Sequence, residues 1–430
     1  MTRAYLDHNA TTPVEPAVLE AMLPYFSADF ANASSIHTPG QRARAAVEAA
    51  REQVAALINA KPQEIVFTSG GTESDNHAIF GSVLPLVTWP SVRSPNPYDD
   101  IDRRKSIAHR KHVISTTVEH EAVLNSCQEL EKRGATVTYL AVNTNGIVDP
   151  ESVRRAIKTE QPRPFEHGVT RVEQQTQIIT IMHANNELGT IQPLEAIGRI
   201  AKEHNIPFHT DAVQSVGKIP VNVNTLNVDL LSLSAHKLYG PKGVGALYIR
   251  TGTQIQQLLY GGHHQRGFRP GTENVAGIVG LGKAAELAQH SLATDAARIS
   301  VLRDKLERGL LARIPHTRAN SAAASRTPNT TNILFSGIEG EALVIALDLK
   351  GLACSVGAAC SSGAVEPSHV LTAIGLSAEE AKSSLRFSLG RHTTEAEIAF
   401  ALDVIPAAVS QLRALSPTYQ KHLAAHHDQL

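Results

Sequence analysis

Cysteine is scarce in this sequence: Cys127, Cys354 and Cys360 are the only three among 430 residues. Three thiols are too few for a disulfide framework, so we expect a reducing compartment, the cytoplasm. Net charge is nearly absent as well, since 40 Lys and Arg stand against 41 Asp and Glu. No global field therefore favours a nucleic acid or an anionic membrane as a partner.

Long hydrophobic runs and targeting signals are also missing. The most apolar stretches, such as Ile178 to Met182, have the length of strands and fall short of the roughly 18 residues of a membrane helix. The first residues, MTRAYLDHNATTP, show neither the apolar core of a signal peptide nor the pattern of a transit peptide. We expect a soluble, globular protein with a large core and more than one domain.

Strand and helix patterns alternate through the first part of the chain. Residues 41–59 place alanine, valine and leucine at helical spacing, which predicts an amphipathic helix. Short apolar runs that end in polar residues follow at 64–68, 112–123, 135–142, 177–189, 206–214, 229–237 and 243–250. This alternation predicts an α/β fold with a mainly parallel sheet covered by helices, where ligands gather beyond the carboxyl ends of the strands.

The pattern changes after about Gly262. Long helical segments at 276–311, strands at 331–335 and 384–390 and a helical C-terminus predict a second, smaller α+β domain. We expect a large cofactor-binding domain over 15–262 and a small domain formed by 1–14 and 263–430. The stretches 85–112 and 159–177 interrupt the alternation and are interpreted as surface loops or insertions without an assigned role.

The segment LSLSAHKLYGPKGVG (231–245) is the most informative stretch. Its strand delivers Ser234, His236 and Lys237 to the carboxyl end, and a Gly- and Pro-rich turn follows. A lysine in such a turn, taken alone, could be a solvated loop residue.

Two further strand ends change that interpretation. Ser69, Gly70, Gly71 and Thr72 follow a strand and open a helix, where free backbone N–H groups suit a phosphate. Asp211 ends another strand, where it could cap a helix or pair with a protonated pyridine nitrogen. A phosphate cradle, a pyridinium partner and a lysine, in this order along the chain, indicate an enzyme that uses pyridoxal 5'-phosphate (PLP).

Ten motifs along the chain carry a resemblance to a known family. They are YLDHNATTP, NASSIH, FTSGGTESDN, VEHEAV, NNELG, HTDAVQSVGK, SAHKLYGPKGVGALY, RPGTEN, SVGAACSSG and LRFSLGR. From Tyr5 to about Pro417 the chain resembles the NifS/IscS-type cysteine desulfurases of the class V aminotransferase family, which have the type I PLP fold. The resemblance implies that the enzyme converts L-cysteine to L-alanine and passes the sulfur to a cysteine of its own.

The resemblance also implies roles for individual residues. Lys237 would form the Schiff base, His120 would stack on the pyridine ring and help move protons, and Arg386 would bind the substrate carboxylate. The implied cofactor ligands are Gly71, Thr72, Ser234 and His236 at the phosphate, Asp211 at the ring nitrogen, Gln214 and Asn185 near the ring hydroxyl, and Thr272 from the neighbouring subunit of a homodimer. Asn185 would also contact the substrate.

Cys360 is the candidate sulfur acceptor of the enzyme. Its surroundings, SVGAACSSG, are small residues typical of a mobile loop. Cys354 and Cys127 are interpreted as core residues, because apolar or helical positions surround them. His263 and His264 are adjacent, which is not the spacing of a metal-ligand set, so no metal is predicted.

Two alternatives stay open at this point. Selenocysteine lyase shares the fold and motifs, and an acidic residue such as Glu121 directly after the histidine is found in selenocysteine-selective relatives. A non-catalytic, sulfur-carrier binding subunit would lack the intact residues Lys237, Asp211, His120 and Cys360. The sulfur-acceptor protein is left open between an iron–sulfur scaffold, a tRNA thiolation enzyme and a carrier protein, since the chain departs from scaffold-serving relatives after Pro417.

Overall fold

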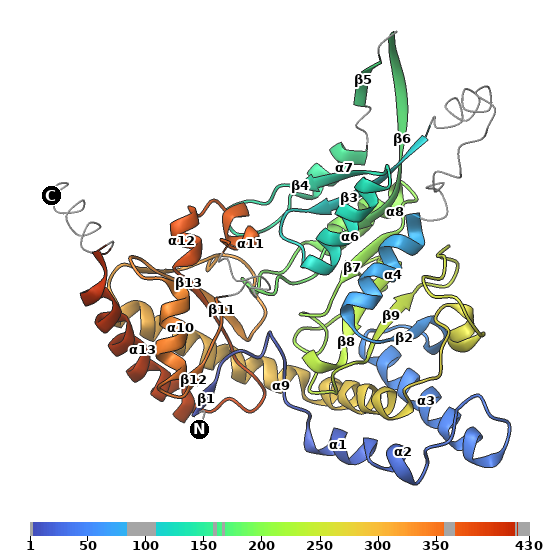
Figure 1. Cartoon of the computed structure of the whole chain (residues 1–430), viewed down its shortest axis with the longest axis horizontal. Coiled ribbons are helices and arrows are strands. Elements are labelled where there is room, and N and C mark those ends of the chain that lie inside the picture. Colours follow the sequence, from blue (N-terminus) through green and yellow to red (C-terminus); the bar gives the residue numbers. More distant parts are fainter. Residues whose placement is uncertain are drawn as a thin grey trace, which may run out of the picture.

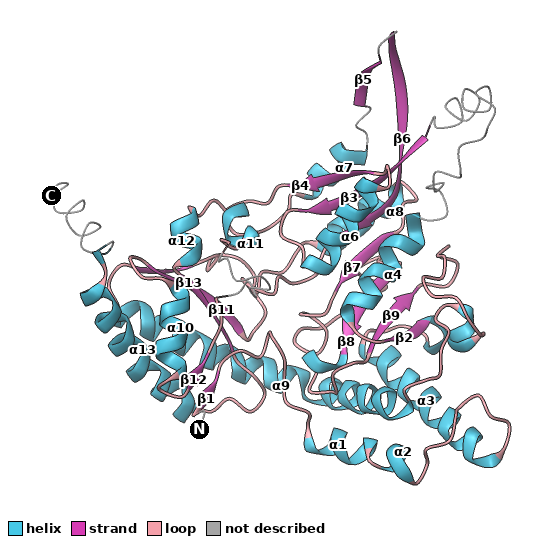
Figure 2. Ribbon diagram, viewed as in Figure 1, coloured by secondary structure: helices cyan, strands magenta, loops and turns pink. Residues whose placement is uncertain are grey.

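A computed structural model describes residues 3–83, 109–157, 161–165, 168–356, 366–417 and 419 (Figure 1). A central sheet with helices on both faces forms one part of the molecule, and a smaller α+β part lies beside it (Figure 2). The long helix α9 (Val275–Arg313) runs between the two parts. The expected fold class is confirmed.

The central sheet has the strand order β2-β9-β8-β7-β6-β3-β4, and β5 pairs with β6. The bounds are β2 (Ile65–Thr68), β3 (His109–Thr116), β4 (Thr136–Leu140), β5 (Gln161–Phe165), β6 (Gly168–Thr180), β7 (Phe208–Asp211), β8 (Leu230–Ser234) and β9 (Gly245–Ile249). The pairs from β8 through β7, β6 and β3 to β4 are parallel, and β9 runs antiparallel to both its neighbours. The sheet is therefore mainly parallel, as predicted.

Both faces of this sheet are buried, which explains why its strands are apolar at successive positions. Leu230 and Leu231 are both fully buried, but they pack into different clusters on opposite faces. On one face lie α4 (Gly71–Val83) and α6 (Glu121–Lys132). The other face is covered by α3 (Thr38–Leu57), α7 (Pro150–Ile157), α8 (Leu194–Glu203) and the first half of α9.

The stretch 159–177, interpreted from the sequence as a surface loop or insertion, contains strand β5 and most of strand β6. Residues 161–165 and 168–180 form an antiparallel hairpin, in which Gln161 pairs with Val172 and Phe165 with Gly168. The prolines in β5 are compatible with a strand because β5 pairs on one side only, where a missing N–H donor is tolerated. Of the other predicted loop, 85–112, the first part lies outside the described residues and 109–112 begin β3.

The smaller part has its own core of leucine, isoleucine and phenylalanine side chains. It contains β1 (Ala4–Tyr5), β10 (Thr317–Ala319), β11 (Thr330–Phe335), β12 (Leu352–Ala353), β13 (Ser384–Ser388), α10 (Gly340–Asp348), α11 (His369–Ala373), α12 (Ala378–Lys382) and α13 (Glu395–Leu415). The remaining short helices are α1 (Pro16–Met22), α2 (Pro24–Ser27), η1 (Pro62–Glu64), η2 (Ala235–Lys237) and η3 (His264–Gly267). The strands predicted at 331–335 and 384–390 and the helical C-terminus are confirmed.

Helix α9 belongs to both cores. Ile278 to Ala288 pack under the central sheet, and Ile299 to Leu310 pack in the smaller core. The predicted domain boundary at 262 stays a prediction.

Helix α13 is the one described helix that is long and apolar enough to cross a membrane, with a mean hydropathy of 1.5. The expectation that the most apolar stretches have only the length of strands does not hold for this helix. Ile398, Ile405 and Val409 on this helix lie in the smaller core, which gives its apolar composition a structural reason.

Candidate active site

Lys237 lies in the turn that follows strand β8. Backbone bonds from Leu238 N and Gly240 N to Ala235 O, at 2.8 and 2.9 Å, close this turn. A Cβ added at Gly240 would lie 2.9 Å from the Ala235 Cβ, so the turn requires glycine there. The backbone of Lys237 is thereby held at the carboxyl end of the central sheet.

The amino group of Lys237 is half-buried and points to the N-terminal segment. It donates to the backbone carbonyls of Asn9 at 2.5 Å and Ala10 at 2.7 Å. Burial, as the larger cause, and the nearby Arg386 guanidinium, as the second, lower the pKa of Lys237 to about 8. An amine with this pKa is available as a nucleophile or base near neutral pH.

Asp211 ends the neighbouring strand β7 and is buried. Its carboxylate accepts from Val213 N at 2.9 Å. Burial raises the pKa of Asp211, while the nearby His120 acts in the opposite direction. A buried carboxylate that has no ion-pair partner among the described residues suits the ring N–H of a pyridinium.

Behind Asp211 lies a second buried acid, Asp75 of helix α4. Burial and the neighbouring Asp211 raise the pKa of Asp75 well above its ordinary value. His209, whose Nε2 lies 3.6 Å from an Asp75 oxygen, has a pKa lowered by burial to about 3. Burial thus disfavours the charged forms of both Asp75 and His209, the two titratable groups that lie close to each other beside Asp211.

The turn between β2 and α4 holds the residues predicted to bind a phosphate. Ser69 and Thr72 are exposed at the N-terminus of this 13-residue helix. A Cβ added at Gly71 would lie 2.8 Å from Val213 Cγ2, so the close approach of the two turns requires glycine. Ser234 also faces this turn, because its Oγ lies 3.8 Å from the position of a Cβ added at Gly70. The predicted residues Gly71, Thr72 and Ser234 are thus brought together.

One part of the cradle is already in use. The N–H of Ser69 donates to Glu73 at 2.8 Å, and Glu73 is paired with Arg269, also at 2.8 Å. The remaining first-turn N–H groups are those that a phosphate would use. His236 bonds to Thr11 Oγ1 through Nδ1 at 3.1 Å, which leaves Nε2 as its second ring nitrogen for such a contact. Burial lowers the pKa of His236 to about 4, so this ring is neutral.

His120, Asn185 and Gln214 line the site from three loops. His120 caps helix α6, where its Nδ1 accepts from Ala122 N at 3.1 Å, and its side chain is exposed. The Asn185 side chain already makes three hydrogen bonds to backbone groups. Its Oδ1 accepts from the N–H groups of Glu187 and Leu188, and its Nδ2 donates to Val118 O. Its contact with Met182 Sδ at 3.5 Å is the weak one that a ligand could replace.

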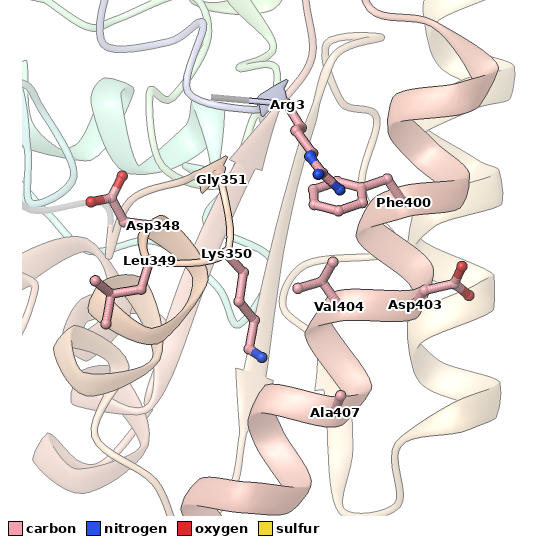
Figure 3. A pocket seen from close by; sticks show the side chains of 9 residues that line it. All are labelled: Arg3, Asp348, Leu349, Lys350, Gly351, Phe400, Asp403, Val404 and Ala407. Atoms are coloured by element: carbon pink, nitrogen blue, oxygen red, sulfur yellow. The ribbon is translucent and has the colours of Figure 1, made fainter. Parts of the chain in front are cut away.

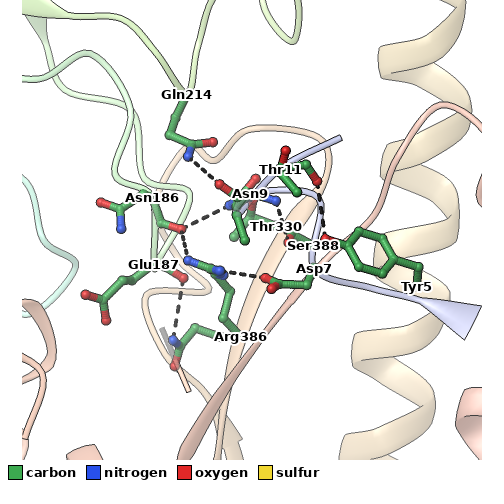
Figure 4. A network of polar contacts seen from close by, with 12 residues as sticks. Tyr5, Asp7, Asn9, Thr11, Asn186, Glu187, Gln214, Thr330, Arg386 and Ser388 are labelled. Carbon is green, nitrogen blue, oxygen red and sulfur yellow. Dashed lines mark hydrogen bonds and ion pairs between the residues drawn. The ribbon is translucent and has the colours of Figure 1, made fainter. Parts of the chain in front are cut away.

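Arg386, on β13 of the smaller part, is buried beside these groups. Its Nη2 donates to Asp7 at 2.6 Å, and its Nη1 donates to the carbonyl of Asn186 at 3.1 Å (Figure 4). Within the described residues its Nε has no hydrogen-bond partner. A buried guanidinium with an unused N–H is a ready hydrogen-bond donor to a carboxylate.

The sequence interpretation missed two residues of this site, Asn9 and Lys218. The Lys218 amine is half-buried and donates to Asn9 Oδ1 at 3.0 Å and to Gln214 Oε1 at 2.5 Å. Burial, followed by the charges of Lys237 and Arg386, lowers the pKa of Lys218. Both residues stood inside the motifs YLDHNATTP and HTDAVQSVGK, which signalled the family but not which side chains meet.

Two predicted residues, Cys360 and Thr272, cannot be joined to this site. Cys360 lies outside the described residues, and Thr272 is exposed on the surface. Cys354 is buried, as predicted, and so is Cys127.

A groove of about 810 Å³ lies elsewhere, on the smaller part, and contains none of the predicted site residues (Figure 3). The cavity beside Lys237 is much smaller, at about 30 Å³, and is also lined by Lys218.

The residues present fit PLP. The open cradle at Gly71 and Thr72, the buried carboxylate of Asp211 and the amine of Lys237 supply a phosphate site, a ring-nitrogen partner and an attachment point. The buried Nε of Arg386 supplies a donor for the substrate. These groups converge from strand ends of the central sheet and from the smaller part of the molecule.

Comparison with known proteins shows the family of the chain. The sequence model described as aminotransferase class-V matches residues 4–86 and 101–400. A cysteine desulfurase IscS of Dictyoglomus turgidum is 47% identical over 417 residues, covering 97% of each chain. A cysteine desulfurase of Nostoc sp. is 48% identical, over 97% of this chain and 95% of the relative.

Solved structures give the same result. A structure described as a NifS-like protein has a TM-score of 0.80 and 35% identity, covering 96% of this chain and 100% of the other. A structure described as SspA in complex with cysteine has a TM-score of 0.73 and 37% identity, covering 91% of this chain and 100% of the other. The chain therefore belongs to the aminotransferase class-V family, in its NifS/IscS-type branch.

Proposed function

We propose that this protein is a PLP-dependent cysteine desulfurase, which converts L-cysteine to L-alanine and takes up the sulfur as a persulfide on Cys360. One observation carries the proposal: the buried Arg386 keeps an unused Nε close enough to Lys237 to lower the pKa of its amine. An N–H of Arg386 that can donate to a carboxylate, together with the nearby Lys237 amine, suits an amino-acid substrate. Relatives named cysteine desulfurase support the choice of amino acid.

PLP supplies a ring that withdraws the electrons released when the substrate loses its α-proton. Lys237 would hold the cofactor, Asp211 would keep the ring nitrogen protonated, and the turn at Gly71 and Thr72 would bind the phosphate with Ser234. His120 would cover the ring and Gln214 would lie at its hydroxyl.

The residues of the chain divide the work on the substrate. Arg386 binds the carboxylate through its unused edge, and the freed Lys237 amine takes the proton from the α-carbon. The Cys360 thiolate attacks the substrate sulfur: an S–S bond forms, the C–S bond breaks and its electron pair stays with carbon. Protons then return to carbon. One enzyme thiol and one cysteine become one persulfide and one alanine, so no external oxidant is required.

The test is alanine formation from L-cysteine by the wild type and by Cys360→Ala. We expect alanine from the wild type and none from the variant, with the visible absorbance of the bound cofactor unchanged. Cys127→Ala is the matched control, since Cys127 is buried in α6 and should leave turnover intact. Undiminished turnover by Cys360→Ala would refute the persulfide. Alanine from selenocysteine but not from cysteine would identify a selenocysteine lyase.

The proposal includes a homodimer in the cytoplasm. Phe26, Phe30, Ile36 and Tyr260 are large apolar side chains with exposures of 64, 75, 91 and 83%, which is unusual for a surface facing water. The loop at Ala33 and Ser34 shares a cleft of about 480 Å³ with His263 and His264, seven or more residues before Thr272. A partner on this face would bring Thr272 toward its cofactor.

Sedimentation of the wild type and of Phe30→Asp tests the dimer. We expect a dimer for the wild type and a shift toward monomer for the variant, with weaker cofactor binding. A fully active wild-type monomer would contradict the proposal. The sulfur acceptor is proposed only as a protein that receives the persulfide sulfur.

A further inference from the structure

Asn9 stands at the centre of the polar network in Figure 4 and is 2% exposed. Its Oδ1 accepts from Lys218 Nζ and from Asn329 Nδ2, both at 3.0 Å. Its Nδ2 donates to the Asn186 carbonyl at 3.0 Å and to Thr330 Oγ1 at 2.9 Å. An amide side chain offers two acceptor positions and two donors, so all four are used.

The backbone around Asn9 is held from both sides. Asn9 N donates to Ser388 Oγ at 2.9 Å, and His8 N donates to Ser388 O at 3.1 Å. On the other side, Thr12 donates to the His236 carbonyl from its N–H at 3.0 Å and from its hydroxyl at 2.9 Å. The segment is therefore clamped between β13 of the smaller part and the turn that carries Lys237.

This clamped segment presents two carbonyl oxygens to Lys237. Asn9 O also accepts from Gln214 Nε2 at 3.0 Å, so the same carbonyl contacts two residues of the proposed cofactor site. Neither acceptor is a carboxylate. Two neutral carbonyls hold an amine by its hydrogens without adding a negative charge that would keep it permanently protonated.

We propose that Asn9 is a positioning residue: its side chain fixes the carbonyls of Asn9 and Ala10 as the docking position for the Lys237 amine whenever that amine is not bound to the cofactor. This inference rests on the proposed function of Lys237. A neutral amine that donates both hydrogens to this carbonyl pair turns its lone pair away from residues 9 and 10. The lone pair is then oriented for proton removal, and the amine is kept from returning at once to the cofactor.

Burial and Arg386 are consistent with this role, since they lower the pKa of Lys237 to about 8 and make the neutral form accessible. The Lys218 amine donates to the Asn9 side chain and, by a second bond, to Gln214, so it links the two residues. The smaller part of the molecule thus determines where the lysine of the larger part rests.

The test compares Asn9→Ala with Asn320→Ala in the full-length protein. Asn320 is the matched control because it is buried, and its amide donates to Asn332 Oδ1 and Ser384 Oγ, in the smaller part, at 2.7 and 3.2 Å. The first readout is acetylation of Lys237 after removal of the cofactor, measured by mass spectrometry against the exposed Lys132 across pH. We expect Asn9→Ala to change the rate at Lys237 by up to about tenfold, the most that the loss of one hydrogen bond between neutral groups gives, and Asn320→Ala to leave it unchanged.

The second readout is steady-state turnover of cysteine with the cofactor bound. Asn9→Ala should lower kcat about tenfold and leave KM within twofold, since Arg386 and Asp7 do not bond to the Asn9 side chain. Equal effects of both substitutions, or no change at Lys237 in Asn9→Ala, would overturn the proposal. If the wild type forms no alanine, the proposed function fails while the labelling comparison still tests the docking position.

A second substitution applies if Asn9→Ala does not fold. Asn9→Asp keeps the oxygen that accepts from Lys218 and Asn329 but adds a negative charge beside two lysines. We expect the pH at which Lys237 becomes reactive to move upward by about one unit. An unchanged pH profile in this variant would overturn the proposal as well.

Discussion

Replacing Arg386 by lysine tests the substrate site most directly. In the structure Arg386 donates one hydrogen bond to Asp7 and one to the carbonyl of Asn186. Its buried Nε is left for a ligand. Lysine has a single nitrogen, and the strong pairing with Asp7 would hold it. The substrate carboxylate then loses a charge-assisted bond, which is worth about 1.5–3 kcal/mol.

That loss corresponds to an increase in KM for cysteine of about 10- to 150-fold. We expect kcat to fall much less and the visible absorbance of the bound cofactor to persist, because Lys237 and Asp211 are untouched. The assay is initial-rate formation of alanine over a wide range of cysteine concentrations. Arg326→Lys is the control: the side chain of Arg326 is 7% exposed and donates two bonds to Glu307 of α9, at 2.7 and 3.1 Å. An unchanged KM in Arg386→Lys, or an equal rise in Arg326→Lys, would refute the assignment.

Three further predictions concern other residues. Borohydride reduction should attach the cofactor to Lys237, and Lys237→Ala should lose the visible absorbance; attachment at Lys218 would show that the wrong lysine was assigned. Alkylation of the native protein should spare Cys127 and Cys354, because burial raises the pKa of Cys127 to about 12 and that of Cys354 further, whereas rapid labelling of either would contradict their place in the core. His112 is buried between Thr138 and Thr176, and burial lowers its pKa to about 4. Between pH 6.5 and 4 the unfolded chain therefore binds the additional proton, so this residue makes stability fall as the pH falls, by about 2 kcal/mol at pH 5. Denaturant unfolding of wild type and His112→Gln at pH 7.5 and pH 5 measures it, and an equal loss of stability in both proteins would exclude His112 as its source.

Much of the fold could be predicted because its signals are local. The apolar residues of β8 followed by SAHK, and the helix pattern at 41–59, reflect strand burial and helical periodicity that neighbouring residues determine by themselves. The same holds for the strand ends at Asp211 and Ser234, since parallel strands meet at one edge of the sheet. The hairpin at 161–180 escaped prediction because its strands depend on pairing with each other, and with β3, rather than on an apolar pattern.

The sequence by itself determined the family, the type of chemistry and which residue types would carry it. Only the tertiary structure decided which side chains meet. Asp7 and Arg386 are 379 residues apart, and Lys237 and the Asn9 carbonyl are 228 residues apart. Contacts over such separations come from packing the smaller part against the central sheet, and no local pattern records them. In the sequence Asn9 is only one residue of the motif YLDHNATTP. Its contacts with distant segments of the chain are visible only in the folded protein.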